Sequence, residues 1–322
     1  MVALRLCKNT PDCKLSQIFF KAPLENTDIK TDSLPIFDTH QHLWDLKLLR
    51  LPWLQKAANL NPELDLNRNF LMDDYLKVIE DQHVIASIYV EVNVIGEDQP
   101  KEVEYILDLF QSYENTLKAA IIGGYPHSPD FQKYVEPMAT IPFIKGVRTV
   151  LNDSDRPRGM CLEKNFIKGC QLLGELNLSF DLCMRPDELM DAAQLADLCP
   201  KTRFIVDHCG NMPVNSQNAK LQASWEEGIR ELSGQENVCC KISGLVEKMD
   251  LPWQSDHLKD VVSFCLDSFG ENRVCFGSDW PMCTQRGSYS KWVDVLKWIV
   301  RGKSLTFQKK LFYENAVLIY RI

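Results

Sequence analysis

The sequence of 322 residues contains neither a long apolar run nor an excess of basic charge. No hydrophobic stretch approaches the roughly 18 residues that a membrane span requires, so a membrane protein is not expected. Acidic residues outnumber basic ones by 44 to 36, and the formal net charge is −8. Because no surplus of lysine and arginine is available to neutralise phosphates, nucleic acid is not expected to be the main partner.

Three short motifs are missing as well. The chain has 12 cysteines but no Cys-x-x-Cys pair, which argues against a zinc ribbon or a thioredoxin-type site. No serine lies in a Gly-x-Ser-x-Gly turn, and no glycine-rich loop follows an apolar run, so serine hydrolases and nucleotide-dependent enzymes are not favoured. Several cysteines lie inside apolar segments, as Cys183 and Cys275 do. We interpret these as buried, reduced thiols of a cytoplasmic protein.

The chain does contain a regular alternation of short apolar runs and amphipathic segments. Segments such as Asp73 to His83 and Asp256 to Phe269 carry apolar residues at intervals of three and four, which is typical of helices that bury one face. The apolar runs predict eight strands, at residues 36–40, 86–92, 119–125, 144–150, 178–184, 203–208, 237–243 and 273–279. Eight such units predict an α/β fold, a single distorted (β/α)8 TIM-type barrel over residues 35–322. Residues 1–34 show no clear period, and we interpret them as an N-terminal extension.

Polar side chains gather at the carboxyl ends of the predicted strands. His40 and His42 are two residues apart on the first strand, so their side chains are expected on the same side. Two imidazoles aimed at one point can hold a transition metal or polarise a carbonyl group. Later strands end near Arg148, His208, Lys241 and Asp279. Since TIM barrels build their active sites at these strand ends, the sequence predicts an enzyme.

Strand alternation predicts which of these side chains face the barrel interior. It directs His208 and Asp279 inward and Asp207 outward, as a capping carboxylate or one that orients its neighbours. Arg148 has two interpretations, a substrate contact or a buried ion pair with Glu91. Lys241 is likewise either a substrate contact or a structural salt bridge.

Two further residues are candidate substrate contacts. Trp44 opens the segment 43–72, which we expect to fold as a loop over the barrel mouth, and His127 follows Pro126 in another loop. A carboxylate such as Asp279 can accept a proton from water and later return it to a leaving group. Imidazoles and cations can stabilise the charge that grows on a carbonyl oxygen. The residue types at the mouth therefore suit hydrolysis.

Short segments around the strand ends, among them Asp38–Trp44, Asp207–Gly210 and Gly277–Pro281, resemble the amidohydrolase superfamily, specifically its amidohydrolase-related lactonase branch. That branch includes hydrolases of fuconolactone and rhamnonolactone and the 2-pyrone-4,6-dicarboxylate hydrolases. The resemblance implies that His40, His42, His208 and Asp279 form the catalytic core, with Asp279 as general base. It also implies that Arg148 binds a carboxylate or carbonyl of the substrate and that Lys241 assists. The matching pieces are Asp38–Trp44, Gly146–Arg148, Asp207–Gly210, Lys241–Gly244, Gly277–Pro281 and Tyr313–Ala316.

The resemblance bears on metal binding as well. Many members of the superfamily complete a metal pair with a histidine on the fifth strand and a carboxylated lysine. Here residues 178–184 contain no histidine, and the fourth strand offers Arg148 in place of a lysine. We therefore do not expect a binuclear centre. Members of the lactonase branch hold one divalent metal or none. We expect a single Zn²⁺ on His40, His42 and Asp279, and the resemblance leaves open whether the reaction requires it.

The predicted function is hydrolysis of a lactone, of a sugar acid in particular, to the open hydroxy acid. One alternative is a non-oxidative decarboxylase built on the same barrel, and another is a barrel that binds a ligand without catalysis. In each case the expected partner is a small molecule. The sequence leaves open which lactone is bound and the oligomeric state.

Overall fold

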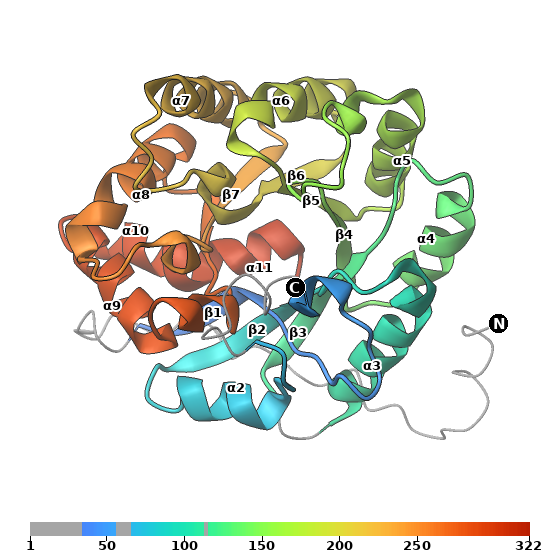
Figure 1. The fold of residues 1–322 in the computed structure, drawn as a ribbon, viewed down its shortest axis with the longest axis horizontal. Helices are drawn as coiled ribbons and strands as arrows, with labels where there is room; N and C mark the ends of the chain where they lie inside the picture. Colours follow the sequence, from blue (N-terminus) through green and yellow to red (C-terminus); the bar gives the residue numbers. More distant parts are fainter. Residues whose placement is uncertain (1–33, 56–65, 113–114) are drawn as a thin grey trace. The chain divides into compact units, whose positions relative to one another are not determined.

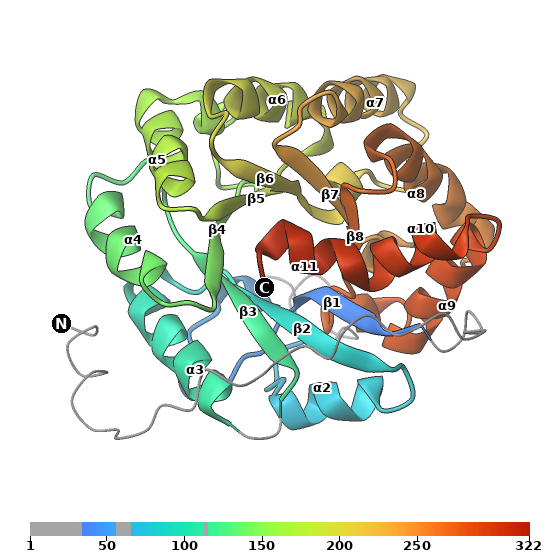
Figure 2. The same ribbon diagram turned by 180° about the vertical axis from the view of Figure 1, so that it is seen from behind.

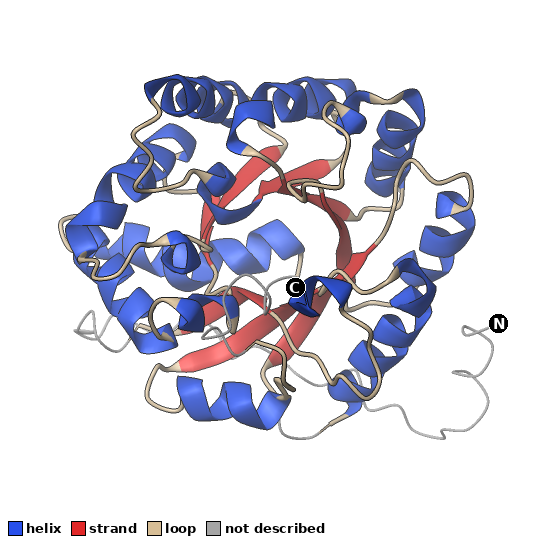
Figure 3. Cartoon of the chain, in the orientation of Figure 1, coloured by secondary structure: helices blue, strands red, loops and turns tan. Residues whose placement is uncertain are grey.

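A computed structural model describes residues 34–55, 66–112 and 115–322. Within this part of the chain, eight strands lie side by side in sequence order and each pairs in parallel with the next. They form a ring enclosed by helices (Figures 1 and 3), so the predicted (β/α)8 barrel is confirmed. The strands are β1 (Ile36–Gln41), β2 (Val84–Val90), β3 (Leu117–Gly123), β4 (Ile144–Val150), β5 (Ser179–Cys183), β6 (Arg203–Val206), β7 (Val238–Ile242) and β8 (Val274–Phe276).

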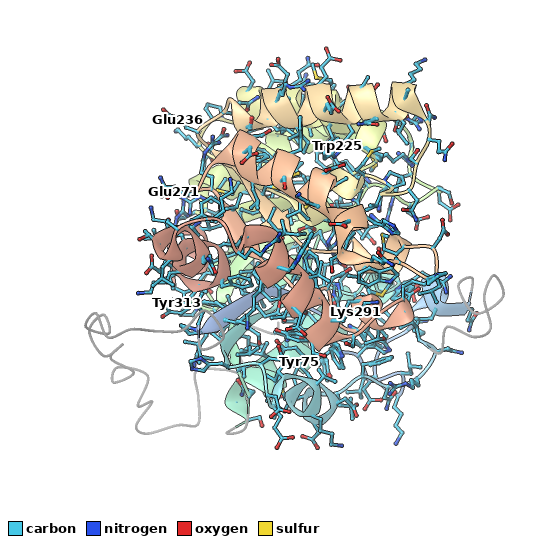
Figure 4. The ribbon with its side chains drawn as sticks, turned by 90° about the vertical axis from the view of Figure 1, so that its left-hand side faces the viewer. Tyr75, Trp225, Glu236, Glu271, Lys291 and Tyr313 are labelled. Carbon is cyan, nitrogen blue, oxygen red and sulfur yellow. The ribbon has the colours of Figure 1, made fainter. Side chains whose placement is uncertain are left out.

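The helices cover the outside of the strands and bury one face each. In α8 (Ser255–Phe269), the buried residues Leu258, Val262 and Leu266 recur at helical spacing, and Gly270 ends the helix with a φ of 68°. Figure 4 shows this layer from the side. The other α-helices are α2 (Met72–Ile79), α3 (Gln99–Gln111), α4 (Phe131–Ala139), α5 (Lys164–Glu175), α6 (Leu189–Leu198), α7 (Ala219–Ser233), α9 (Tyr289–Val300), α10 (Leu305–Lys309) and α11 (Asn315–Tyr320).

Short turns of helix follow most strands at the mouth of the barrel. They matter here because three of them carry residues of the candidate site. These turns are η3 (Gly96–Asp98), η4 (Met160–Leu162), η5 (Pro186–Glu188), η6 (Asp207–Asn211), η7 (Val246–Lys248) and η8 (Met282–Gln285), and a turn of π-helix, η9 (Lys310–Glu314), joins α10 to α11.

One end of the barrel is filled by apolar side chains and closed by α11. Phe37, Ile121 and Ile205 pack together inside the barrel, and Ala316 and Ile319 of α11 belong to the same cluster. Figure 2 shows α10 and α11 running across this end of the ring. The terminal segment that includes Ala316 thus plugs the barrel at the amino ends of its strands, and the carboxyl ends remain available for a site.

The barrel closes where its first strand meets its last. Gln41 forms an isolated parallel bridge with Trp280, and two backbone hydrogen bonds flank it, from Asp279 N to His40 O (2.8 Å) and from His42 N to Trp280 O (2.7 Å). Asp38 strengthens this seam, because its carboxylate accepts from Ser278 N and from the Tyr75 hydroxyl of α2, each at 2.8 Å. Tyr75 is labelled in Figure 4.

Two strands end earlier than the sequence predicts. β6 stops at Val206 and β8 at Phe276, whereas the predicted strands run to residues 208 and 279. His208 and Asp279 instead adopt left-handed backbone conformations, with φ of 55° and 56°. Non-glycine residues rarely do so, because the Cβ atom crowds the backbone there. Strand alternation therefore does not govern where these side chains point.

The predicted extension over residues 1–34 falls, except for Leu34, outside the described residues. None of the helices in the described ranges has the length and apolar character needed to span a bilayer.

Candidate active site

A cavity of about 320 Å³ opens at the carboxyl ends of the strands. Five of the predicted site residues line it, namely His42, Trp44, Arg148, His208 and Asp279. The remaining lining residues are Trp53, Val92, Asn93, Val150, Asn152, Asp153, Cys183, Asn211, Glu247 and Met282.

His40, His42 and Asp279 converge at this cavity. The His40 Nε2 and His42 Nε2 atoms are 3.2 Å apart, and Asp279 Oδ1 lies 3.6 Å from the first and 3.3 Å from the second. A tetrahedral Zn²⁺ with bonds of about 2.1 Å separates its ligand atoms by about 3.4 Å. The three side chains thus fit three corners of a zinc site, and His42 and Asp279 both face the cavity, where a fourth ligand would enter.

Backbone contacts orient His40 at the end of β1 and His42 just beyond it. The carbonyl oxygen of Val90 accepts a hydrogen bond from His42 Nδ1 at 2.8 Å, which leaves the Nε2 lone pair directed at Asp279. The pairing register of β1 with β2 shifts between Asp38 and Gln41, the stretch that contains His40. Gly277 of the seam makes room for it, since a Cβ atom at this glycine would lie 2.8 Å from that of His40.

His208 lies on the turn η6 and faces the same point. Its Nε2 is 4.0 Å from Asp279 Oδ1, and its Nδ1 is 2.9 Å from Ser243 Oγ. Gly244, with a φ of 61°, leaves the space for the ring, because a Cβ atom there would overlap it. The turn is held from outside by Trp225 of α7 (Figure 4), whose indole donates to Cys209 O at 2.8 Å.

A buried charge network lies behind His40. Lys241 Nζ lies 2.8 Å from Asp181 Oδ2, 3.0 Å from Asp207 Oδ1 and 3.1 Å from His40 Nδ1. Lys241 is fully buried and does not line the cavity, so its geometry is that of the structural salt bridge. The prediction that Asp207 faces outward is wrong. Asp207 follows Ile205 of the interior cluster and lies inside the barrel, 3.5 Å from His40 Nδ1.

Arg148 forms the predicted ion pair and also lies where it can contact a substrate. Its Nε pairs with Glu91 Oε1 at 2.6 Å, which confirms the ion pair, and its side chain also lines the cavity. Arg148 Nη1 lies 3.2 Å from His40 Nε2. A metal ion on His40 would therefore replace this hydrogen bond.

Burial sets the protonation of the central groups. It lowers the pKa of His42 to about 4, aided by the Arg148 charge, and with the Lys241 charge it lowers the pKa of His40 well below its usual value. Burial also lowers the pKa of His208. At neutral pH the three imidazoles are uncharged, so each offers one lone pair, for a metal or a proton, and one N–H donor. Burial raises the pKa of Asp279 to about 7, against the opposing charge of Arg148.

Several cavity residues were not predicted from the sequence. Glu247 belongs to η7, five residues beyond the end of β7, and burial together with the Asp279 charge raises its pKa to about 7. Trp53 lies within the predicted mouth loop, where its indole donates to Val92 O at 2.8 Å. No strand-end pattern marks either residue. His127, in contrast, does not line the cavity and stacks on Phe166, with 6.5 Å between ring centroids.

Comparison with known proteins gives this geometry a context. An L-fucono-1,5-lactonase of Burkholderia multivorans is 26% identical over 296 residues, covering 88% of this chain and 95% of that protein. A crystal structure of an amidohydrolase from Burkholderia multivorans with bound zinc has a TM-score of 0.76 at 24% identity, over 89% of this chain and 99% of the other.

A more distant structure has a different activity. A dihydroxybenzoic acid decarboxylase of Polaromonas with bound manganese has a TM-score of 0.64 at 12% identity, covering 89% of this chain and 97% of the other. The family model named Amidohydrolase matches residues 37–322, which include all eight strands except Ile36 and every residue of the site described above. The chain therefore belongs to the amidohydrolase family.

Proposed function

We propose that this protein hydrolyses the lactone of a sugar acid to the open hydroxy acid. The observation that carries the proposal is the convergence of Asp279 with three uncharged imidazoles at the base of the cavity. The similarity to L-fucono-1,5-lactonases supports the same reaction class.

The chemistry follows from the positions of these groups. Asp279 accepts a proton from a water molecule as that water attacks the lactone carbonyl. Arg148 and His208, which line the cavity beside it, stabilise the charge that grows on the carbonyl oxygen. Asp279 then returns the proton to the ring oxygen as the C–O bond breaks, so a single carboxylate serves both steps.

His40, His42 and Asp279 would hold one divalent metal, and Zn²⁺ suits two imidazoles and a carboxylate. When bound, the metal would supply Lewis-acid polarisation of the carbonyl group. The hydrogen bond from His42 to Val90 O and the charge network behind His40 fix the orientation of both rings.

The rest of the cavity lining favours an uncharged polyol substrate. Trp44 and Trp53 offer flat apolar faces, with ring centroids 5.8 Å apart and planes nearly perpendicular. Amides and acids that can bind hydroxyl groups come from Asn93, Asn152, Asp153, Asn211 and Glu247. Among the lining residues in the described part of the chain, Arg148 is the single lysine or arginine, and Glu91 already neutralises it. Because the cavity offers no unpaired cation among these residues, a dicarboxylate substrate is disfavoured.

Decarboxylation remains the second candidate, because the barrel is similar to that of a dihydroxybenzoic acid decarboxylase with bound manganese. The acids Asp153, Glu247 and Asp279 in the cavity lining oppose it. They would repel the carboxylate of an aromatic acid.

A panel of sugar 1,4- and 1,5-lactones, assayed with a pH indicator before and after chelation, tests the proposal. We expect acid release from one or a few lactones, loss of this activity on chelation and recovery with Zn²⁺. His127→Gln provides a matched control, because this histidine lies outside the cavity, and it should keep wild-type rates. Silence on all lactones together with CO₂ release from a hydroxybenzoate would replace hydrolysis by decarboxylation.

We also propose that the protein works in the cytoplasm on this small-molecule substrate. The ten cysteines of the described residues are buried and unbridged, as suits a reducing compartment. Microscopy of the tagged full-length protein tests this location.

A further inference from the structure

A second cavity, of about 250 Å³, lies at the opposite end of the barrel from the candidate active site. The amino ends of β4, β5 and β6 form one side of it, and the end of α11 forms the other. Figure 2 shows this end of the barrel, with α11 lying across the strands. The lining residues are Ala139, Ile141, Pro142, Ile144, Lys145, Leu176, Asn177, Leu178, Ser179, Arg203, Ile319, Tyr320 and Arg321.

The charges of this second cavity are all of one sign. Lys145, Arg203 and Arg321 line it, and no aspartate or glutamate is among its lining residues in the described chain. None of the three cations has a carboxylate of the described residues within 4.0 Å. Three unneutralised cations on one small cavity are unexpected in a chain with a net charge of −8.

The three side chains are fixed by main-chain carbonyl groups. Lys145 Nζ donates to Arg321 O at 3.1 Å, Arg203 Nη1 to Leu318 O at 3.1 Å, and Arg321 Nη1 to Asn177 O at 2.9 Å. Some of these bonds cap the carboxyl end of α11, where cations are favourable. Capping does not use all the donors, since an ammonium group has three and a guanidinium group five.

The cations also affect one another. Burial and the Arg321 charge lower the pKa of Lys145, and burial and the Arg203 charge lower the pKa of Arg321. Such mutual repulsion would be relieved by a shared anion.

We propose that this second cavity binds a small oxyanion of the phosphate class, held by Lys145, Arg203 and Arg321. Guanidinium groups match tetrahedral oxyanions with paired N–H donors, and an ammonium group adds a compact point charge. The volume suits inorganic phosphate or the head of a phosphate monoester rather than a larger ligand. The site is independent of the reaction proposed for the barrel mouth.

Calorimetric titration of the full-length protein with inorganic phosphate, in chloride buffer of low ionic strength, tests this inference. We expect one saturable site whose affinity falls as salt is added. Lys145→Met and Arg321→Met should each weaken binding about tenfold, a loss of about 1.4 kcal/mol. Lys201→Met is the matched control, because this exposed lysine lies two residues from Arg203 but does not line the cavity, and it should bind as the wild type does.

A second titration with glycerol phosphate separates the two sources of the ligand. Tighter binding than inorganic phosphate indicates a phosphate monoester, and equal or weaker binding indicates the free ion. Circular dichroism confirms that each variant is folded. The inference is overturned if millimolar phosphate gives no saturable binding, if Lys201→Met weakens binding as much as Lys145→Met, or if the double variant Lys145→Met/Arg321→Met binds as tightly as the wild type.

Discussion

The two ends of this barrel are built from the same eight strands but differ in almost every physical property. The closed end holds an apolar cluster that α11 completes, and its surface cavity is lined by cations. The mouth holds uncharged imidazoles, buried acids and backbone in left-handed conformations. The apolar packing at the closed end therefore stabilises the barrel, and it offsets the cost of buried polar groups and strained backbone at the mouth.

The transition between the two ends takes only two residues along a strand. On β7, Cys239 belongs to the apolar cluster and Lys241 to the charge network. On β6, Ile205 packs in the cluster, and Asp207 follows as an ion-pair partner of Lys241. Two residues span roughly 6.6 Å of strand. A layer this thin separates the apolar core from the reactive groups, and substitutions on either side of it should act differently.

The largest effect on function is expected from Asp279→Asn at the mouth. Removing the general base should lower kcat for lactone hydrolysis by about 10²- to 10⁴-fold. The stability should not fall, because burial already raises the pKa of this carboxyl to about 7 and so disfavours its charge. Steady-state kinetics and a thermal melt of the same sample measure both. Wild-type rates in this variant would remove Asp279 from the mechanism.

Lys241→Met tests the charge network that lies directly above the apolar cluster. The substitution leaves Asp181 buried without its cation and Asp207 with only Arg148, whose Nη1 is 3.6 Å from Asp207 Oδ2, so we expect the free energy of unfolding to fall by about 3–5 kcal/mol. Urea denaturation measures the loss, and Lys201→Met at an exposed site should cost less than about 0.5 kcal/mol. Adding Asp181→Asn to Lys241→Met should recover part of the stability. A loss equal to that of the control would show that the network is not structural.

At the closed end, Ile319→Ala should affect stability and leave catalysis unchanged. It removes a buried side chain from the plug formed by α11, at a cost of about 2–4 kcal/mol. The neighbouring Leu318 is 71% exposed, so Leu318→Ala should change the unfolding free energy by less than about 0.5 kcal/mol. The kcat and KM of both variants should match the wild type. A changed KM in Ile319→Ala would mean that the two ends are coupled.

The smallest effect, taken per pH unit, is a pH dependence of stability from Glu102 of α3. Burial and the Glu91 charge raise its pKa to about 8, whereas an unfolded glutamate titrates near pH ~4.3. Between these values the folded protein holds a proton that the unfolded chain releases. The free energy of unfolding should therefore fall as the pH rises, by at most about 1.4 kcal/mol per pH unit. Urea denaturation from pH 5 to 8 should show a shallower slope for Glu102→Gln than for the exposed control Glu104→Gln. Equal slopes would refute the assignment.

Much of the fold could be predicted from the sequence because its apolar residues follow the strand and helix periods. The eight strands and the inner faces of helices such as α8 are properties of local pattern. His40, His42 and Arg148 could be predicted for the same reason, since His40 and Arg148 belong to strands and His42 directly follows the end of β1. The prediction for Asp207 is wrong because it counts the alternation from His208, which lies beyond the end of β6 in a left-handed conformation. Counted from Ile205, the same alternation places Asp207 inside the barrel.

Glu247 and Trp53 were missed for a different physical reason. Each reaches the cavity through the path of a loop, and that path depends on tertiary contacts. A sequence pattern with a period of two or 3.6 residues carries no information about such a path. His127 illustrates the converse, because a loop that follows β3 carries this side chain to Phe166, outside the cavity.

The seam between β1 and β8 has a consequence for how the protein is made. His40 and His42 are translated near the start of the barrel, whereas Asp279 follows the last strand. A nascent chain whose β8 is still inside the ribosome lacks Asp279, the third residue of the proposed metal site, and its β1 and β7 edges are unpaired. A chain that ends before Asp279 therefore cannot assemble the proposed site, however well its first seven strands fold.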